Sequence, residues 1–317
     1  MSDAKVTAVR GIDLAVRDVD ASAEFYKTVW GLEEVAGAPG AVYLRATGLE
    51  HHVLALHAAP QSGFIGTRLA VQAKADVDAL HAKALGYGAE VVERPQELPR
   101  QAGGGYGFSF RSPDGFLQTV SSDVTRHAEV IADPTRPNKF SHVVMRVANF
   151  PQQRAFFIDL LGFKLSDETD GIDFLRCSPD HHSVALAKAM GPGLHHMAFE
   201  LPNLDSLMYA CGRVRSKGYE LEWGVGRHSG PGKNIFSFFV EPNGFACEYT
   251  TEMDQIDDAT YPVRSAQWWR ENRPDGGPCA WRMAKQHSQK LLRARSGRLV
   301  EELNGTCTEA ISRTLAN

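Results

Sequence analysis

The chain contains an internal duplication, and this repetition constrains its fold more than any single motif. Residues 9–35, VRGIDLAVRDVDASAEFYKTVWGLEEV, match residues 140–166, FSHVVMRVANFPQQRAFFIDLLGFKLS, in pattern. Each segment predicts an alternating strand, a polar turn, an amphipathic helix with two adjacent aromatic residues, and a glycine after the helix. We therefore expect Gly31 and Gly162 to end two equivalent helices.

A second pair of segments repeats in the same way. The stretches that begin at Gly66 and Leu194 each predict a strand, a turn, a helix, a glycine and a strand, and each continues through a Pro-x-Gly turn into another strand. The sequence therefore predicts an α+β fold of four βαβββ modules that pair into two halves. We place the domains at 1–130 and 138–252, with a proline-bearing linker over 131–139.

The tail, residues 253–317, matches no repeat. It holds the pair Trp268 and Trp269, a Gly/Pro break, and a basic segment around 283–303 with helical spacing. We expect the tail to form a lid or a contact between subunits. The tryptophans with Arg264 suit closure over an aromatic anion, and packing between subunits is an equal alternative.

Composition excludes several classes of partner. The 317 residues include 34 Lys and Arg against 38 Asp and Glu, a net charge of −4, which gives no reason to expect nucleic acid or an anionic membrane. Five cysteines without a Cys-x-x-Cys pair suit reduced thiols. Neither a signal core nor a long apolar run is present. We expect a cytoplasmic protein without nucleic-acid or membrane partners.

The duplication lets one half serve as a control for the other. In the second half, two imidazoles and a carboxylate lie at repeat positions separated by 54 and 106 residues from the first of them: His142, His196 and Glu248. At nearly the same separations, the first half has Asp13, Arg68 and Gln118. Arginine is permanently protonated and cannot bind a metal ion. We therefore expect a metal site in the second half alone.

Strand parity favours one histidine of the pair His195 and His196. Because neighbouring side chains on a strand point to opposite faces, His195 is expected beside the large apolar residues and His196 on the face away from the helices. The same parity places His142 and Glu248 on that face. Two neutral imidazoles and a carboxylate form the facial triad of Fe(II) sites, with open positions for substrate and dioxygen. Mn(II) is the alternative, and Zn(II) a lesser candidate.

Three motifs resemble those of the vicinal oxygen chelate superfamily, and within it the type I extradiol catechol dioxygenases: FSHVVMRV, DHHSVALAKAMGPGLHHMAFE and GRHSGPGKNIFSFFVEPNGFACEY. The resemblance covers roughly residues 6–250 and implies two tandem domains with the metal in the second. It implies that His142, His196 and Glu248 are the iron ligands. It further implies a small aromatic diol and dioxygen as partners, and a homo-oligomer.

The resemblance also assigns roles around the metal. His182 stands 14 residues before His196, where the family has an acid–base histidine, and His228 matches a histidine that hydrogen-bonds substrate. The family usually has a tyrosine 10 residues before the glutamate, where this chain has Phe238. We expect Val144 and Phe238 to line the substrate pocket. The missing hydroxyl indicates either an unusual substrate, such as a trihydroxylated ring, or a different reaction.

The sequence thus predicts an extradiol ring-opening dioxygenase that acts on a substituted catechol or a trihydroxylated single ring. Two alternatives stay open: a metal-dependent lyase or isomerase of the same fold, and a metal-free protein that binds an aromatic ligand. Two smaller features carry no function. The pair His51 and His52 is interpreted as a remnant of the duplication, and GGGYG at 103–107 as a flexible loop.

Overall fold

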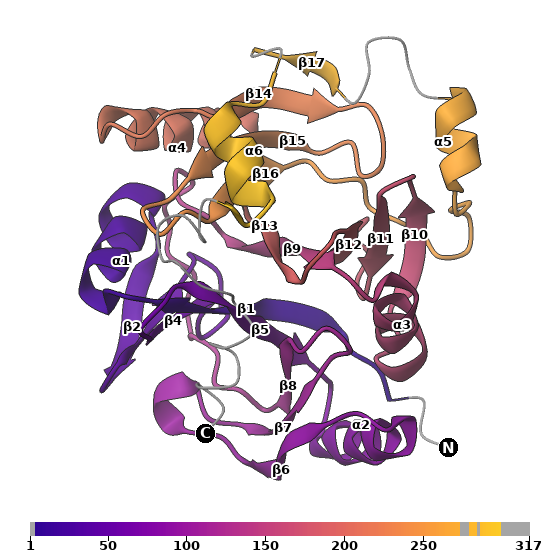
Figure 1. The fold of residues 1–317 in the computed structure, drawn as a ribbon. Helices are drawn as coiled ribbons and strands as arrows, with labels where there is room; N and C mark the ends of the chain where they lie inside the picture. The colour runs from indigo at the N-terminus through magenta and orange to yellow at the C-terminus, as the bar shows by residue number, and fades with distance from the viewer. Residues whose placement is uncertain (1–3, 273–278, 284–285, 299–317) are drawn as a thin grey trace.

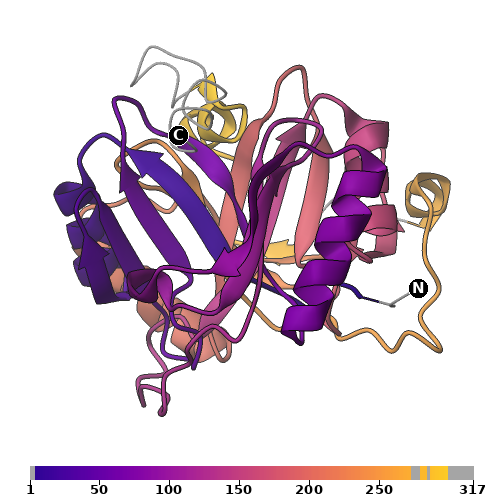
Figure 2. The ribbon, with the colours of Figure 1, turned by 90° about the horizontal axis from the view of Figure 1, so that it is seen from below.

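The computed structural model describes residues 4–272, 279–283 and 286–298. Two mixed sheets lie side by side, the first half in indigo to purple and the second in pink to orange (Figures 1 and 2). In strand order the sheets read β2-β3-β4-β1-β5-β8-β7-β6 and β10-β11-β12-β9-β13-β16-β15-β14-β17.

The first half comprises these elements: β1 (Ala8–Val16), α1 (Val19–Phe25) with a π-helical turn (Tyr26–Trp30), β2 (Glu33–Ala38), β3 (Ala41–Arg45), β4 (Leu54–Ala58), β5 (Gly63–Ala70), α2 (Lys74–Tyr87), β6 (Val91–Glu97), a 3₁₀ turn (Arg100–Ala102), β7 (Tyr106–Arg111) and β8 (Leu117–Ser122). The second half comprises β9 (Lys139–Val147), α3 (Phe150–Ala155) with a π-helical turn (Phe156–Leu160), β10 (Lys164–Glu168), β11 (Ile172–Arg176), β12 (Val184–Lys188), β13 (Gly193–Glu200), α4 (Leu204–Ser216), β14 (Trp223–His228), β15 (Ile235–Val240) and β16 (Ala246–Thr251). The tail contributes α5 (Ala266–Asn272), β17 (Cys279–Arg282) and α6 (Gln289–Arg295).

Strand pairing confirms the four modules. Within each module the first strand runs parallel to the last, as β1 does to β4, β5 to β8, β9 to β12 and β13 to β16. The two modules of each half meet through antiparallel first strands, β1 with β5 and β9 with β13. Gly31 and Gly162 end the first helices of the two halves in left-handed conformation, with φ of 91° and 77°.

One hydrophobic core crosses from the first half into the second. The indole of Trp30, at the end of the first helix, stacks on the ring of Tyr249 in β16 with centroids 3.9 Å apart. The Tyr249 hydroxyl donates a 2.6 Å hydrogen bond to the Trp30 carbonyl. Arg213 of α4 donates to the carbonyls of Val29 and Trp30. The halves are therefore packed together as one body.

The tail belongs to the second half. β17 extends the second sheet beyond β14, α5 packs at β10, and α6 crosses β13, β15 and β16 (Figure 1). Among the described residues no helix is long and apolar enough to cross a membrane. Four cysteines are free: Cys177, Cys211, Cys247 and Cys279. Cys307 lies outside the described residues, as do residues 284–285 and 299–303 of the basic segment.

Candidate metal centre

Three neighbouring strands bring the expected ligands together. β13 lies between β9 and β16, and its Ala198 pairs with His142 on one side and with Glu248 on the other. His196, two residues before Ala198, points to the same face. The Nε2 atoms of His142 and His196 lie 3.5 Å and 3.2 Å from the Glu248 Oε2. All three side chains are buried, and their ligand atoms lie within 4.8 Å of one another.

Polar neighbours orient each of the three side chains. The Ser141 hydroxyl lies 3.1 Å from the Nδ1 of His142, and the Nδ1 of His195 lies 2.6 Å from that of His196. The amide of Asn234 donates to the Oε1 of Glu248 at 3.2 Å and to the Thr250 hydroxyl at 2.8 Å. These contacts turn both Nε2 atoms and the free carboxylate oxygen toward one point. Outer partners of this kind fix the tautomer and direction of metal ligands.

The protonation states of the cluster suit a divalent cation. Burial acts to raise the pKa of Glu248, but its interactions with the two imidazole rings outweigh burial and hold that pKa well below its usual range. Burial lowers the pKa of His196 to about 3. At neutral pH the cluster therefore offers a carboxylate and a neutral imidazole, the forms in which these groups bind metal.

The expectation that His195 lies on the core face is wrong. Leu194 pairs with Met145 and His196 with Val144, so that His195 is an extra residue, a β-bulge, in β13. The bulge rotates its imidazole to the side of His196, with ring centroids 4.9 Å apart. Strict alternation of side chains fails at this residue, and the His195 ring lies beside the expected ligand His196.

The residue-by-residue match between the halves is also corrected by the strand register. Gly11 pairs with Arg68, and Arg68 with Thr119, just as His142 pairs with Ala198 and Ala198 with Glu248. The first-half counterparts of the three ligands are thus Gly11, Gly66 and Thr119. Asp13, Arg68 and Gln118 occupy neighbouring positions.

Within the described residues, the second-half triad is the one cluster of metal-ligand type found. A Cβ added to Gly11 would lie 2.1 Å from the Val53 carbonyl oxygen, and one added to Gly66 would lie 1.7 Å from that of Leu117. The strands approach so closely that no side chain fits there. Asp13 and Arg68 instead form a bidentate ion pair beside them.

A buried relay of side chains leads to His182. The carboxylate of Asp167 accepts hydrogen bonds from the His181 ring at 3.0 Å, the Tyr261 hydroxyl at 2.9 Å and the Arg264 backbone N–H at 2.9 Å. The Nδ1 of His181 lies 3.1 Å from that of His182. If the Nε2 of neutral His181 donates to Asp167, its Nδ1 must accept from His182. The lone pair of His182 is then on Nε2.

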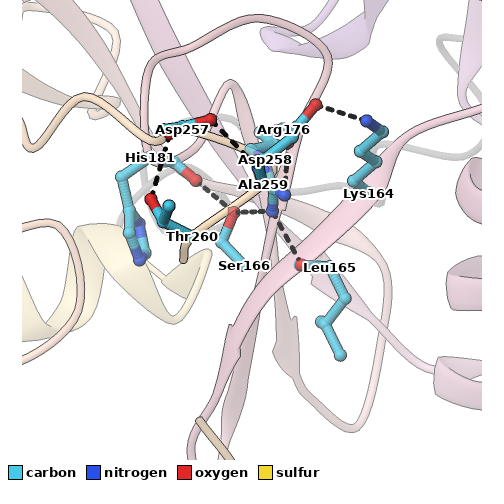
Figure 3. A network of polar contacts seen from close by, with 9 residues as sticks. All are labelled: Lys164, Leu165, Ser166, Arg176, His181, Asp257, Asp258, Ala259 and Thr260. Carbon is cyan, nitrogen blue, oxygen red and sulfur yellow. Dashed lines mark hydrogen bonds and ion pairs between the residues drawn. The ribbon is translucent and has the colours of Figure 1, made fainter. Parts of the chain in front are cut away.

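His182 packs directly on the metal cluster. Its ring centroid lies 4.4 Å from that of His142, and it is buried. Burial and the surrounding histidines hold its pKa well below the usual range, which favours the neutral form. The backbone beside it is fixed by the network in Figure 3, where Ser166 donates to the His181 carbonyl and Arg176 joins Ser166 to Asp258 of the tail.

The other predicted residues gather on the same side of the sheet. Val144 is buried between His196 and the small residues of β12, and the Phe238 ring lies 5.1 Å from the His196 ring. The His228 ring stacks on Phe236 at 4.2 Å and lies 5.7 Å from the Trp223 ring. Sequence reasoning missed Asn234, Asp167 and Tyr261, which carry no local pattern and act only through the folded structure.

The metal-cluster face of the second sheet is covered by a different helix of the tail from the one expected. Trp268 and Trp269 lie in α5 at the edge strand β10, where the Arg264 guanidinium packs 4.7 Å and 5.5 Å from their ring centroids. Of the strands that carry the cluster, β13 and β16 are covered by α6 instead (Figure 1). Its Leu291 and Ala294 pack with Phe236 and Phe238.

Comparison with known proteins connects this geometry to chemistry. Metapyrocatechase 2 of Cupriavidus necator is 32% identical over 123 residues, 38% of each chain. A 2,2',3-trihydroxybiphenyl dioxygenase of Sphingomonas paucimobilis is 39% identical over 117 residues, 34% of this chain and 39% of that one. The matches thus span about four tenths of these curated relatives. The crystal structure of the Mn(II)-bound glyoxalase from Novosphingobium aromaticivorans is 40% identical, has a TM-score of 0.78, and matches over 82% of this chain and 87% of that one.

The sequence profile of one superfamily matches both halves separately, over residues 8–119 and 139–249. These two segments begin with β1 and β9, extend into β8 and β16, and include all three residues of the metal cluster. The chain therefore belongs to the Glyoxalase/Bleomycin resistance protein/Dioxygenase superfamily.

Proposed function

We propose that the protein is an extradiol dioxygenase that opens an aromatic ring next to a diol and adds both atoms of dioxygen. The observation that carries this proposal is the buried cluster of His142, His196 and Glu248, the two-imidazole, one-carboxylate set of non-haem oxygenases. Relatives named metapyrocatechase and trihydroxybiphenyl dioxygenase support it. The proposed substrate is a substituted catechol or a trihydroxylated single ring.

The proposed cofactor is Fe(II), with Mn(II) as the alternative that the Mn(II)-bound relative supports. His142, His196 and Glu248 would hold it, and the partners of each ligand described above fit that role. When bound, such a metal withdraws charge from the diol oxygens and brings the electron-rich ring beside dioxygen.

Protons would be handled by His182. With its lone pair on Nε2, set by the contacts to His181 and Asp167, this side chain can accept a proton from a substrate hydroxyl and return it after ring cleavage. Its depressed pKa keeps it neutral before the reaction. His228 is proposed to hydrogen-bond the substrate, and Val144 and Phe238 to line the pocket; their common side of the sheet supports both roles.

The test is oxygen uptake by anaerobically metal-loaded protein, recorded together with absorbance, against a panel of substituted catechols and trihydroxybenzenes. The proposal predicts uptake matched to a yellow ring-opened product, lost in His196→Ala and retained in His51→Ala, which changes the remnant pair of the first half. Parallel loading with Fe(II) and Mn(II) identifies the active metal. Stoichiometric metal without uptake on any ring would rule the proposal out for these substrates.

A lyase or isomerase is the second candidate, favoured by a similar structure that is named a glyoxalase. Such an enzyme uses its divalent ion as a Lewis acid and needs no dioxygen. Activity on a non-aromatic carbonyl substrate under strict anaerobic conditions, supported by Zn(II) or Ni(II), would favour it over ring cleavage. The expected homo-oligomer is a separate prediction that light scattering at micromolar protein tests.

A further inference from the structure

At Phe238, next to the metal cluster, the site lacks a hydroxyl group that could donate a hydrogen bond. Phe238 pairs with Glu248 across β15 and β16, and its ring meets the His196 ring edge-on at 5.1 Å. The related dioxygenases that the sequence resembles usually carry a tyrosine here, whose hydroxyl donates to the ionised oxygen of the substrate. A phenyl ring cannot donate such a hydrogen bond. If the proposed substrate is a diol monoanion, its charge needs another donor.

The tail helix α6 places the guanidinium of Arg295 beside Phe238. Leu291 and Ala294 anchor the helix in the apolar cluster that contains Trp223 and Phe238. On the same helix the Cζ atom of Arg295 lies 4.5 Å from the centroid of the Phe238 ring and 5.5 Å from that of Trp223. The guanidinium therefore covers the ring whose hydroxyl is missing.

The charge of Arg295 lacks a local partner in the described part of the chain. Its Nε is buried without a hydrogen-bond partner there, and no carboxylate of these residues lies within ion-pair distance. Burial lowers the pKa of Arg295 to about 10, so the side chain is still a cation at neutral pH. An unpaired buried donor costs about 1–3 kcal/mol, more for a charged group, unless a ligand satisfies it.

The field of this cation reaches the metal cluster. The Phe238 ring that the guanidinium covers meets the His196 ring with centroids 5.1 Å apart, so one ring separates the cation from a proposed metal ligand. The donor therefore lies within electrostatic reach of the atoms that would hold the metal. An anionic ligand beside those atoms would feel the same field.

We propose that Arg295 donates through its guanidinium to the ionised oxygen of the bound aromatic diol, and thereby takes the role that Phe238 cannot perform. This inference rests on the proposed function and specifies the substrate form as the monoanion. A cation holds an anionic oxygen more strongly than a neutral hydroxyl does, because the hydrogen bond is charge-assisted. The planar fork of the guanidinium also fixes its direction.

The experiment measures ligand binding without turnover. 4-Nitrocatechol, whose absorbance reports its ionisation, is titrated anaerobically into metal-loaded wild type, Arg295→Met, Arg295→Lys and the control Arg293→Met, an exposed arginine of the same helix. We expect Arg295→Met to bind about 10- to 100-fold more weakly. Its bound ligand should ionise at a higher pH. Arg295→Lys should retain part of the effect, and Arg293→Met should match wild type.

The double variant Phe238→Tyr with Arg295→Met provides the rescue. Returning a hydroxyl to position 238 should restore ionisation of the bound ligand, whereas a merely structural loss in α6 would not be repaired by it. Metal content and circular dichroism show that each variant is folded. Wild-type affinity and ionisation in Arg295→Met would overturn the inference while the proposed function stands. Failure of the wild type to bind any catechol would instead overturn the proposed function itself.

Discussion

At the scale of single residues, the sequence predicts the ligands better than their supports. His142, His196 and Glu248 could be found because a repeat and strand parity single them out, and these rules depend only on local geometry. Asn234, which orients Glu248, lies in a loop between β14 and β15 where no periodicity applies. Asp167 reaches His182 only through a partner 14 residues along the chain. Such contacts exist only once the sheet has closed.

Asn234→Ala should weaken metal binding without removing a ligand. The Oε1 of Glu248 would lose its donor, and the carboxylate could turn away from the two imidazoles. Loss of an outer partner of this kind lowers metal affinity by about 10- to 100-fold. A competition titration with a chelator measures the affinity. Asn203→Ala is the matched control, since Asn203 caps α4 through the Ser206 N–H far from the ligands. Equal metal affinity in the two variants would contradict the role assigned to Asn234.

Asp167→Asn should slow the reaction and leave metal binding intact. An amide can present N–H in place of a carboxylate oxygen, which reverses the tautomer of His181 and removes the lone pair of His182 from Nε2. We expect kcat to fall by about 10- to 100-fold, within the range of general acid–base effects, with KM little changed. Steady-state oxygen uptake measures both. Asp170→Asn, an exposed carboxylate in the turn after β10, is the control. A rise in KM with constant kcat would show that Asp167 serves substrate binding instead.

At the scale of elements, the modules were predictable and their registers were not. Each strand, turn and helix repeats with its glycine, so four βαβββ units follow from the sequence alone. The register between strands depends on bulges and turn lengths, which change by one residue without altering composition. Matching by residue separation alone assigned Asp13 to a position that Gly11 occupies, although the aligned segments 9–35 and 140–166 already place Gly11 opposite His142. The tail gave no repeat for comparison, and α6 over the metal face was not foreseen.

Substitution of glycines in the first half tests this strand register through its effect on the stability of the protein. Gly66→Ala places a Cβ 1.7 Å from the Leu117 carbonyl oxygen, so the β5–β8 pair must separate. We expect a loss of about 3 kcal/mol or more in the free energy of unfolding, measured by urea titration. Gly86→Ala lies in α2 with open space around the new Cβ, and should stabilise by about 0.5–1 kcal/mol. Two variants of equal stability would mean that the strands do not approach as described.

At the scale of the whole molecule, corresponding turns join the two halves reciprocally. Asp114, in the Pro-x-Gly turn of the first half, accepts hydrogen bonds from the Asn149 backbone and side chain at the start of α3. Asn243, in the matching turn of the second half, donates to the Ser22 hydroxyl of α1. Each half thus supports a helix of the other, and the shared core continues across them. The repeat predicts both turns, but their contact is a property of the assembled pair.

The carboxyl group behind the second turn makes stability depend on pH. Glu241 is buried and accepts from the Phe245 N–H and the Asn243 amide, and burial raises its pKa from 4.5 to about 7. The folded protein keeps this proton up to about pH 7, whereas the unfolded chain releases it near 4.5. The group therefore contributes fully below pH 4.5, and the protein loses about 3 kcal/mol of stability as pH rises to 7. Urea titrations across this range should show that loss in wild type and in the exposed control Glu24→Gln, but not in Glu241→Gln. The same decline in Glu241→Gln would assign the pH dependence to other groups.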